Sequence, residues 1–263
     1  MLVAIDVGNT QTVVGLFGPG DGPAGSGPEL AYHWRIATVA SRTADELAML
    51  IDQLFQLQGL DPEDVITGLA VASVVPRQRT ALREMADRWF KVDTVIVEPG
   101  VRTGMPIHYD NPKEVGADRI ADAVAAYERY GGPTIVVDFG TATTFEVVSE
   151  RGEYLGGVIL PGIEISLEAL FARAALLPRV ELIEPRSVLA KNTVESVQSG
   201  VIYGFAAQVD GLCRRLEDEL GPCQVVATGG LAGLIGPYSA AIEHHEPWLT
   251  LEGLRIIFGR NQK

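Results

Sequence analysis

Short apolar stretches separated by polar turns open the chain, and they predict a β-first α/β fold. Three strands are expected first, over Leu2–Val7, Thr12–Phe17 and Leu30–Ile36. Thr43 and Glu46 form a capping-box pattern ahead of apolar residues at helical spacing, which predicts a helix over residues 44–58. A strand over Ile66–Val75, a helix from Pro76 through Phe90 and a strand over Thr94–Val97 complete the predicted order βββαβαβ.

The second half of the chain restarts the same order of elements. Strands are predicted over Thr134–Asp138, Thr143–Val148, Tyr154–Leu160 and Val225–Ala227, and helices over residues 164–176 and Thr193–Leu220. Duplication of one β-first unit explains this recurrence better than coincidence does.

A motif recurs with the elements. Ile5-Asp6-Val7-Gly8-Asn9-Thr10-Gln11-Thr12-Val13 returns 132 positions later as Val137-Asp138-Phe139-Gly140-Thr141-Ala142-Thr143-Thr144-Phe145. One copy alone is typical of an ordinary hairpin turn. Two copies at matched positions favour a phosphate cleft, because each Asp can hold a cation or its water, while turn N–H groups and Thr hydroxyls can cradle phosphate oxygens. The cleft is predicted to lie between the two halves.

Composition excludes some partners. The 263 residues include 34 acids against 21 Lys and Arg, a net charge of −13, and no basic run stands out, so nucleic acid is an unexpected partner. Cys213 and Cys223 match no Cys-x-x-Cys spacing and fit a reducing compartment as two buried apolar residues, although a bridge between them stays open. No apolar run approaches ~20 residues, and the first residues predict a strand instead of an export signal. A cytoplasmic protein without membrane contact is expected.

Other familiar sites are missing from the sequence. It has no P-loop, His-Glu-x-x-His or Gly-x-Ser-x-Gly motif, and its four histidines lack ligand spacing. The Gly- and Pro-rich segment 18–28 is expected to be a mobile loop. Its match to Gly-x-Gly-x-x-Gly, at Gly20, Gly22 and Gly25, precedes no amphipathic helix and is dismissed.

Several blocks together resemble type III pantothenate kinase. They are Asp6 to Thr10, Gly104 to Arg119, Asp138 to Thr144, Gly156 to Gly162, and Asn192-Thr193 through Ser199-Gly200. They occur in the family's order up to about residue 230, where Ala227-Thr228-Gly229-Gly230 resembles the turn that lets the backbone approach a nucleoside, or an ordinary strand-to-helix turn. No motif position departs from the pattern, and only segment 18–28 looks expanded.

The resemblance implies a fold, a reaction and partners. The fold would be α/β, with two duplicated ribonuclease-H-like domains clamping ATP in a cleft between them, as in acetate and sugar kinases, heat-shock ATPases and actin. Boundaries are expected at 1–115 and 116–263, with the last helix able to pack back on the first domain. The reaction would be ATP-dependent phosphorylation of pantothenate to 4'-phosphopantothenate, the first step of coenzyme A synthesis. Mg2+ with ATP, a monovalent cation (K+ or NH4+) and a homodimer are also implied.

The same resemblance distributes roles among residues. ATP would be bound by Asp6, Val7, Gly8, Asn9, Thr10, Gln11, Thr12, Val13 and Thr141. Pantothenate would be bound by Tyr109, Gly116, Ala117, Asp118, Arg119 and Thr193. Asp138 would bind the monovalent cation, and Asp118 would be the catalytic base.

Elementary chemistry is compatible with these roles for Asp118 and Arg119. A helix begins either near Asn111-Pro112 or after Gly116, and the sequence leaves both starts open. In the second case Asp118 lies in the first turn, where the helix dipole favours a charged carboxylate able to accept a hydroxyl proton. Arg119 would offer a planar fork to a carboxylate or phosphate. Without the resemblance, a helix-capping acid and a surface Arg would be the favoured explanation of the pair.

Two rival functions stay open. A non-enzymatic regulator or ATP switch could use the same fold, since fold does not fix function. Intact nucleotide loops and the Asp118-Arg119 pair favour catalysis over that alternative. A kinase of another small hydroxy acid or sugar is the second rival, because acceptor specificity depends on a few contacts that sequence does not place in space.

Overall fold

The computed structural model describes residues 1–20 and 28–262. Most of the loop predicted over segment 18–28, and with it Gly22 and Gly25, lies outside the described residues. The chain divides into two compact units: unit 1 comprises 1–105, 110–125 and 250–263, and unit 2 comprises 106–109 and 126–249. The boundary expected between residues 115 and 116 stays a prediction about domains.

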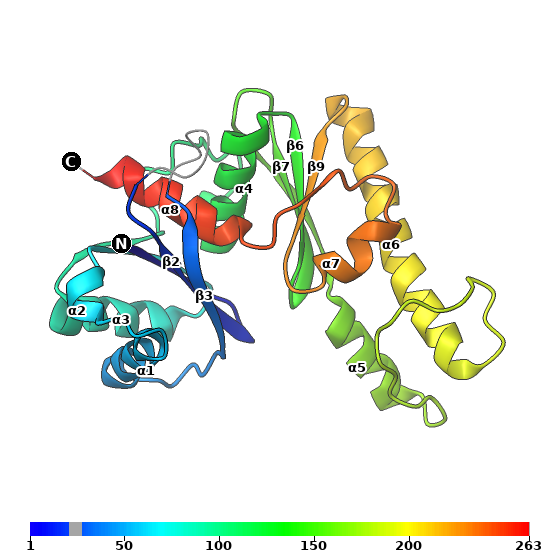
Figure 1. The fold of residues 1–263 in the computed structure, drawn as a ribbon. Helices are drawn as coiled ribbons and strands as arrows, with labels where there is room; N and C mark the ends of the chain where they lie inside the picture. The colour runs from blue at the N-terminus through cyan, green and yellow to red at the C-terminus, as the bar shows by residue number, and fades with distance from the viewer. Residues whose placement is uncertain (21–27, 263) are drawn as a thin grey trace. The chain divides into compact units, whose positions relative to one another are not determined.

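Unit 1 is built on a five-stranded sheet (Figure 1). In chain order its strands are β1 (Leu2–Val7), β2 (Gln11–Phe17), β3 (Leu30–Ala37), β4 (Gly68–Ser73) and β5 (Asp93–Ile96). Their spatial order is β3-β2-β1-β4-β5, with β1 antiparallel to β2 and parallel to β4. The strand expected over Ile66–Val75 is shorter, because the chain turns at both of its ends.

The two faces of this sheet have different packing partners. Alternate residues of β1 such as Val3 and Ile5 join a fully buried apolar cluster with residues of α1 (Ala44–Gln56) and α3 (Pro76–Met85). The other face carries Gly15 and Gly68, whose missing side chains admit Leu251 and Phe258 of α8 (Leu249–Asn261). Small residues there let a helix lie close to the strands.

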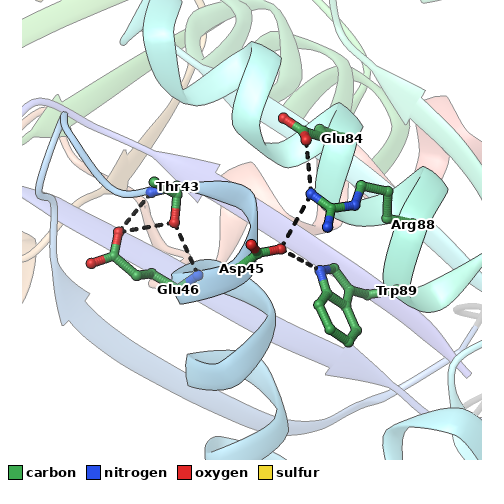
Figure 2. Close-up of polar contacts among 6 residues, drawn as sticks. All are labelled: Thr43, Asp45, Glu46, Glu84, Arg88 and Trp89. Carbon is green, nitrogen blue, oxygen red and sulfur yellow. Dashed lines mark hydrogen bonds and ion pairs between the residues drawn. The ribbon is translucent and has the colours of Figure 1, made fainter.

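Helix α1 begins as the sequence predicts. Thr43 Oγ1 accepts from the Glu46 N–H at 3.3 Å, and Glu46 Oε2 accepts from the Thr43 N–H at 2.8 Å (Figure 2). Asp45 in the first turn accepts from Trp89 Nε1 at 2.9 Å and pairs with Arg88 at 3.3 Å. These contacts tie the start of α1 to the segment that follows α3.

The helix predicted from Pro76 through Phe90 changes type before it ends. An α-helical part, α3, gives way at Ala86 to a π-helical turn, η2 (Ala86–Phe90), which stops at Lys91 with a φ of 53°. A short helix that was not predicted, α2 (Pro62–Val65), lies between α1 and β4 and is capped by Asp61. Its four residues are too few to show a helical period.

Unit 2 repeats the sheet of unit 1. Its strands are β6 (Thr134–Phe139), β7 (Ala142–Val148), β8 (Tyr154–Pro161), β9 (Gln224–Thr228) and β10 (His244–His245). Read as β8-β7-β6-β9-β10, their order matches that of unit 1 strand by strand. Even the register shift near the end of the second strand recurs, between Leu16 and Phe17 and between Val147 and Val148. The predicted duplication of a β-first unit is confirmed.

Helices cover the apolar face of the second sheet. They are α5 (Ile163–Arg173), α6 (Thr193–Leu220) and α7 (Ala232–Ile235), followed by the 3-10 turn η4 (Gly236–Tyr238). Figure 1 shows α6 running along this sheet, and its Val201, Ile202 and Val209 join the buried cluster of unit 2. Helix α5 ends at Arg173, three residues before the predicted limit, because Ala174 leaves the helical conformation.

Helix α4 (Ala117–Tyr130) contributes residues to both units, and the 3-10 turn η3 (Pro112–Glu114) precedes it. Within unit 1 it meets α8 at very short range, since a Cβ at Gly253 would lie 1.9 Å from the Ala121 carbonyl oxygen. Within the described ranges, no helix combines the length and the apolar character needed to cross a membrane.

Candidate active site

The first acidic hairpin closes the end of β1. Asp6 pairs with Val13 across the hairpin and is half-buried, and the Gly8 N–H donates to the Gln11 carbonyl at 3.0 Å. Asn9 and Thr10 at the tip of the turn are exposed. The turn therefore offers amides and hydroxyls to solvent beside a carboxylate, as a phosphate-binding loop requires.

The second hairpin is one residue shorter. Asp138 pairs with Thr144, and the Gly140 N–H donates to the Ala142 carbonyl at 3.1 Å. Val7 pairs with Thr12, whereas Phe139 pairs with Thr143, so the spacing of 132 holds up to the turn and becomes 131 after it. Thr12 and Thr143 are thus the equivalent buried threonines. Thr141, expected to contact ATP, is exposed in the turn.

Two glycines bring backbone against the second hairpin. A Cβ at Gly229, where φ is +92°, would lie 2.2 Å from Asp138 Oδ1. A Cβ at Gly162, the N-cap of α5, would lie 2.2 Å from the Thr141 carbonyl oxygen. The glycine turn after β9 and the start of α5 therefore both adjoin this hairpin.

Asp118 lies in the first turn of α4, which begins after Gly116. The Gly116 carbonyl accepts the first helical bond, from the Ile120 N–H at 3.1 Å, and the Arg119 N–H donates to Asp118 Oδ1 at 2.8 Å. A Cβ at residue 116 would lie 2.3 Å from Asp118 Oδ1. Glycine at 116 therefore lets the carboxylate fold back over the helix start.

Burial raises the pKa of Asp118, and this effect exceeds the lowering by the Arg119 N–H and the Arg119 positive charge. The helix start does favour the charged form, as expected, but removal from water outweighs it. A carboxylate whose pKa is raised by loss of solvation holds an accepted proton more strongly than an exposed one does. This environment suits a general base.

The residues expected to hold pantothenate divide between the units. Gly116, Ala117, Asp118 and Arg119 belong to unit 1. Tyr109 belongs to unit 2, where its ring meets Tyr154 edge-on at 6.4 Å. Thr193, also in unit 2, is the first residue of α6, next to the capping Asn192, and is exposed.

The side chains of the two hairpins offer carboxylate and hydroxyl oxygen atoms as metal ligands. Among residues 1–20 and 28–262, no group of three or more His, Cys, Asp or Glu side chains could by itself hold a metal ion. Mg2+ commonly binds through one or two carboxylates together with substrate phosphates, and an acidic hairpin such as that of Asp6 fits this mode. At Asp138, glycine at 229 keeps a side chain away from the carboxylate, whose oxygens are of the kind that a monovalent ion binds.

Solved structures of the same fold include kinases. Over 98% of both chains, a Campylobacter jejuni protein described as a Baf family transcriptional activator matches with a TM-score of 0.59 and 19% identity. A Sinorhizobium meliloti protein described as a 2-dehydro-3-deoxygalactonokinase matches with a TM-score of 0.56 and 12% identity, over 99% of this chain and 95% of that one. At such identities the likeness concerns the fold. The shared fold is therefore α/β, with two similar units that are each built on a five-stranded sheet, as predicted.

Sequence similarity narrows the class further. The family model for type III pantothenate kinase matches residues 2–215. A type III pantothenate kinase of Myxococcus xanthus is 55% identical over 99% of both chains, and one of Moorella thermoacetica is 54% identical over 99% of this chain and all of that one. The chain belongs to the type III pantothenate kinase family.

Proposed function

We propose that this chain transfers the γ-phosphoryl group of ATP to the terminal hydroxyl of pantothenate, giving 4'-phosphopantothenate for coenzyme A synthesis. The observation that carries the proposal is the identity of more than half over the whole length of several type III pantothenate kinases. The intact acidic hairpins and the half-buried Asp118, whose pKa is raised by loss of solvation, agree with it. Phosphoryl transfer needs mostly alignment and neutralised charge, which acidic hairpins with metal ions can supply.

We assign the nucleotide to both hairpins. In this assignment Asp6, Val7, Gly8, Asn9, Thr10, Gln11, Thr12 and Val13 hold the ATP phosphates with Mg2+, and Thr141 contacts ATP. The exposed amides at the tip of the first turn support it.

We assign the acceptor to α4 and its neighbours. Asp118 takes the proton of the pantothenate hydroxyl as that oxygen attacks the γ-phosphorus and ADP leaves. Arg119 binds the pantothenate carboxylate, and Gly116, Ala117, Tyr109 and Thr193 shape the site. Tyr109 is 36% exposed, so a ligand can reach its side chain.

A substrate screen tests the acceptor. Purified protein with Mg-ATP should phosphorylate pantothenate, and the product should gain the mass of one phosphoryl group. Galactonate-type sugar acids and hexoses, offered at the same concentration, should give no product. If a sugar acid reacts faster than pantothenate, the chain is instead a kinase of another hydroxy acid or sugar.

We further propose a cytoplasmic homodimer with a monovalent cation, K+ or NH4+, at Asp138. Exposed apolar side chains occur on the edge strand β8, on α5, on the segment that leads to α6 and in the first turn of α6, and a second copy of the chain would cover them. They are Leu155, Ile159, Ile165, Leu170, Leu176, Ile183, Val188, Leu189 and Val194.

Sedimentation tests the dimer. The wild-type chain should sediment as a dimer, and Ile159→Asp, at a side chain 63% exposed, should give monomers. Leu57→Asp is the matched control, since Leu57 is 77% exposed but lies in unit 1 at the end of α1. A fully active monomeric wild-type protein would refute this part.

A further inference from the structure

The second sheet carries polar side chains on both strands that flank Asp138. Asp138 of β6 pairs with Thr144 of β7 on one side and with Thr228 of β9 on the other. Directly paired residues point to the same face of a sheet, with Cβ atoms about 4.5–5.5 Å apart. One carboxylate therefore lies between two hydroxyls on a single face, on the side opposite Phe139 and the apolar core.

The first sheet has nothing comparable at the equivalent positions. There Asp6 pairs with Val13 and with Ala72. The two sheets share strand order and register, so Val13 corresponds to Thr144 and Ala72 to Thr228. The fold therefore does not require polar residues at these two positions. The hydroxyls of the second sheet call for another explanation.

In the described part of the chain the hydroxyls of Thr143 and Thr144 both lack a hydrogen-bond partner, but only Thr144 lies on the face of Asp138. Its oxygen is buried and makes no hydrogen bond. Thr228 is also buried, at 2% exposure. Leaving a buried hydroxyl unpaired costs about 1–3 kcal/mol, so a native protein is expected to give such a group a partner, and a bound ion beside Asp138 would be one for Thr144.

The backbone at two glycines lies close to the Asp138 carboxylate. A Cβ at Gly229 would lie 2.2 Å from Asp138 Oδ1, and one at Gly140 would lie 3.3 Å from Asp138 Oδ2. Both carboxylate oxygens are therefore approached by side-chain-free backbone. The Asp138 carboxylate, with one negative charge, and the two paired hydroxyls thus lie on one face where glycine backbone leaves the carboxylate uncovered by other side chains.

We propose that Thr144 and Thr228 are ligands of the monovalent cation, and that with Asp138 they form an oxygen-lined seat present only in the second sheet. The inference rests on the cation proposed above and names the side chains that bind it. Neutral hydroxyl oxygens can replace water around a weakly hydrated cation, as carbonyl oxygens do in potassium channels. A single carboxylate with neutral oxygens matches a single positive charge.

Replacing a single threonine hydroxyl with a methyl group of similar size tests the proposed seat. Thr144→Val and Thr228→Val keep the shape of the side chain and delete the oxygen. The matched control is Thr143→Val, which deletes a neighbouring buried hydroxyl on the opposite face. Thermal unfolding is followed as KCl replaces choline chloride at constant ionic strength, both without nucleotide and with Mg-ADP.

The seat predicts a K+-dependent rise of the melting temperature in the wild-type protein and in Thr143→Val. The KCl concentration that gives half of this rise should increase about tenfold or more in Thr144→Val and in Thr228→Val, since bonds to a charged group are lost. Thr144→Ser, which retains the hydroxyl, should respond like the wild type. Circular dichroism at low temperature confirms that each variant is folded.

Two results would overturn the seat. In the first, Thr144→Val and Thr228→Val keep the wild-type K+ response, or Thr143→Val loses as much. In the second, KCl and choline chloride give the same melting temperature under both nucleotide conditions. Pantothenate-dependent ADP release by the same preparations would show, in either case, that the kinase assignment stands without the seat.

Discussion

At the scale of single residues, Asp118 has the environment of a general base. Its carboxylate lies over Gly116, accepts the Arg119 N–H and has its pKa raised by burial. Asp118→Asn preserves size and hydrogen bonding but cannot take a proton. We expect kcat to fall by about 10²–10⁴-fold while ATP affinity is unchanged. Steady-state kinetics and nucleotide titration check this, and near-normal turnover would reject Asp118 as the base.

The raised pKa of Asp118 also predicts how stability changes with pH. A carboxyl whose pKa is higher in the folded state stabilises the fold when protonated, below its ordinary value of 3.8, and loses that contribution as pH rises through the folded value. Asp118→Asn removes this loss. Its melting temperature should therefore exceed that of the wild type more at pH 7 than at pH 4. An equal or smaller difference at pH 7 would show that burial does not strain this carboxylate.

Some site residues could be predicted from sequence and others could not. The repeated acidic hairpin and the blocks around Asp118 led to Asp6, Asp138 and Asp118, whose roles stay predictions. The sequence did not lead to Thr144 and Thr228 as candidate cation ligands, because that proposal depends on which residues pair across strands. A comparison of the two halves after the turn could have identified Thr144, but only with the one-residue difference in turn length known.

At the scale of elements, the contact between α4 and α8 in unit 1 depends on a glycine. Gly253→Ala would place its Cβ 1.9 Å from the Ala121 carbonyl oxygen, so the helices must separate. We expect a loss of about 1–3 kcal/mol in the free energy of unfolding, as in other overpacked sites. Gly259 of the same helix has open space around it, and Gly259→Ala should stabilise by about 0.5–1 kcal/mol. Urea unfolding compares the two variants, and equal effects would contradict this packing.

Long periodic elements were predicted well, and short ones were not. Helix α6 has the predicted limits, Thr193–Leu220, and the strands agree within about two residues. The sequence did not indicate α2, the π-helical end after α3, or β10, since two to five residues show no period. The limits of α8 were not predicted either. Its apolar residues Leu251, Leu254 and Ile257 face buried surroundings set by the tertiary fold.

At the scale of the whole molecule, duplication with divergence organises the chain. Both sheets have the same strand order and the same acidic first hairpin. They differ in what surrounds the acid: Val13 and Ala72 in one sheet, Thr144 and Thr228 in the other. The two sheets thus have the same fold but different side chains beside the acid. This difference agrees with the proposal that one hairpin binds Mg-ATP and the other a monovalent cation.

The most direct test of the proposed function is ADP release by the purified protein with Mg-ATP, with and without pantothenate, in K+ and in Na+ buffers. We predict that release requires pantothenate and falls when Na+ replaces K+. A chain that releases no additional ADP on addition of pantothenate in either buffer would contradict the kinase assignment, while its nucleotide-binding fold would remain.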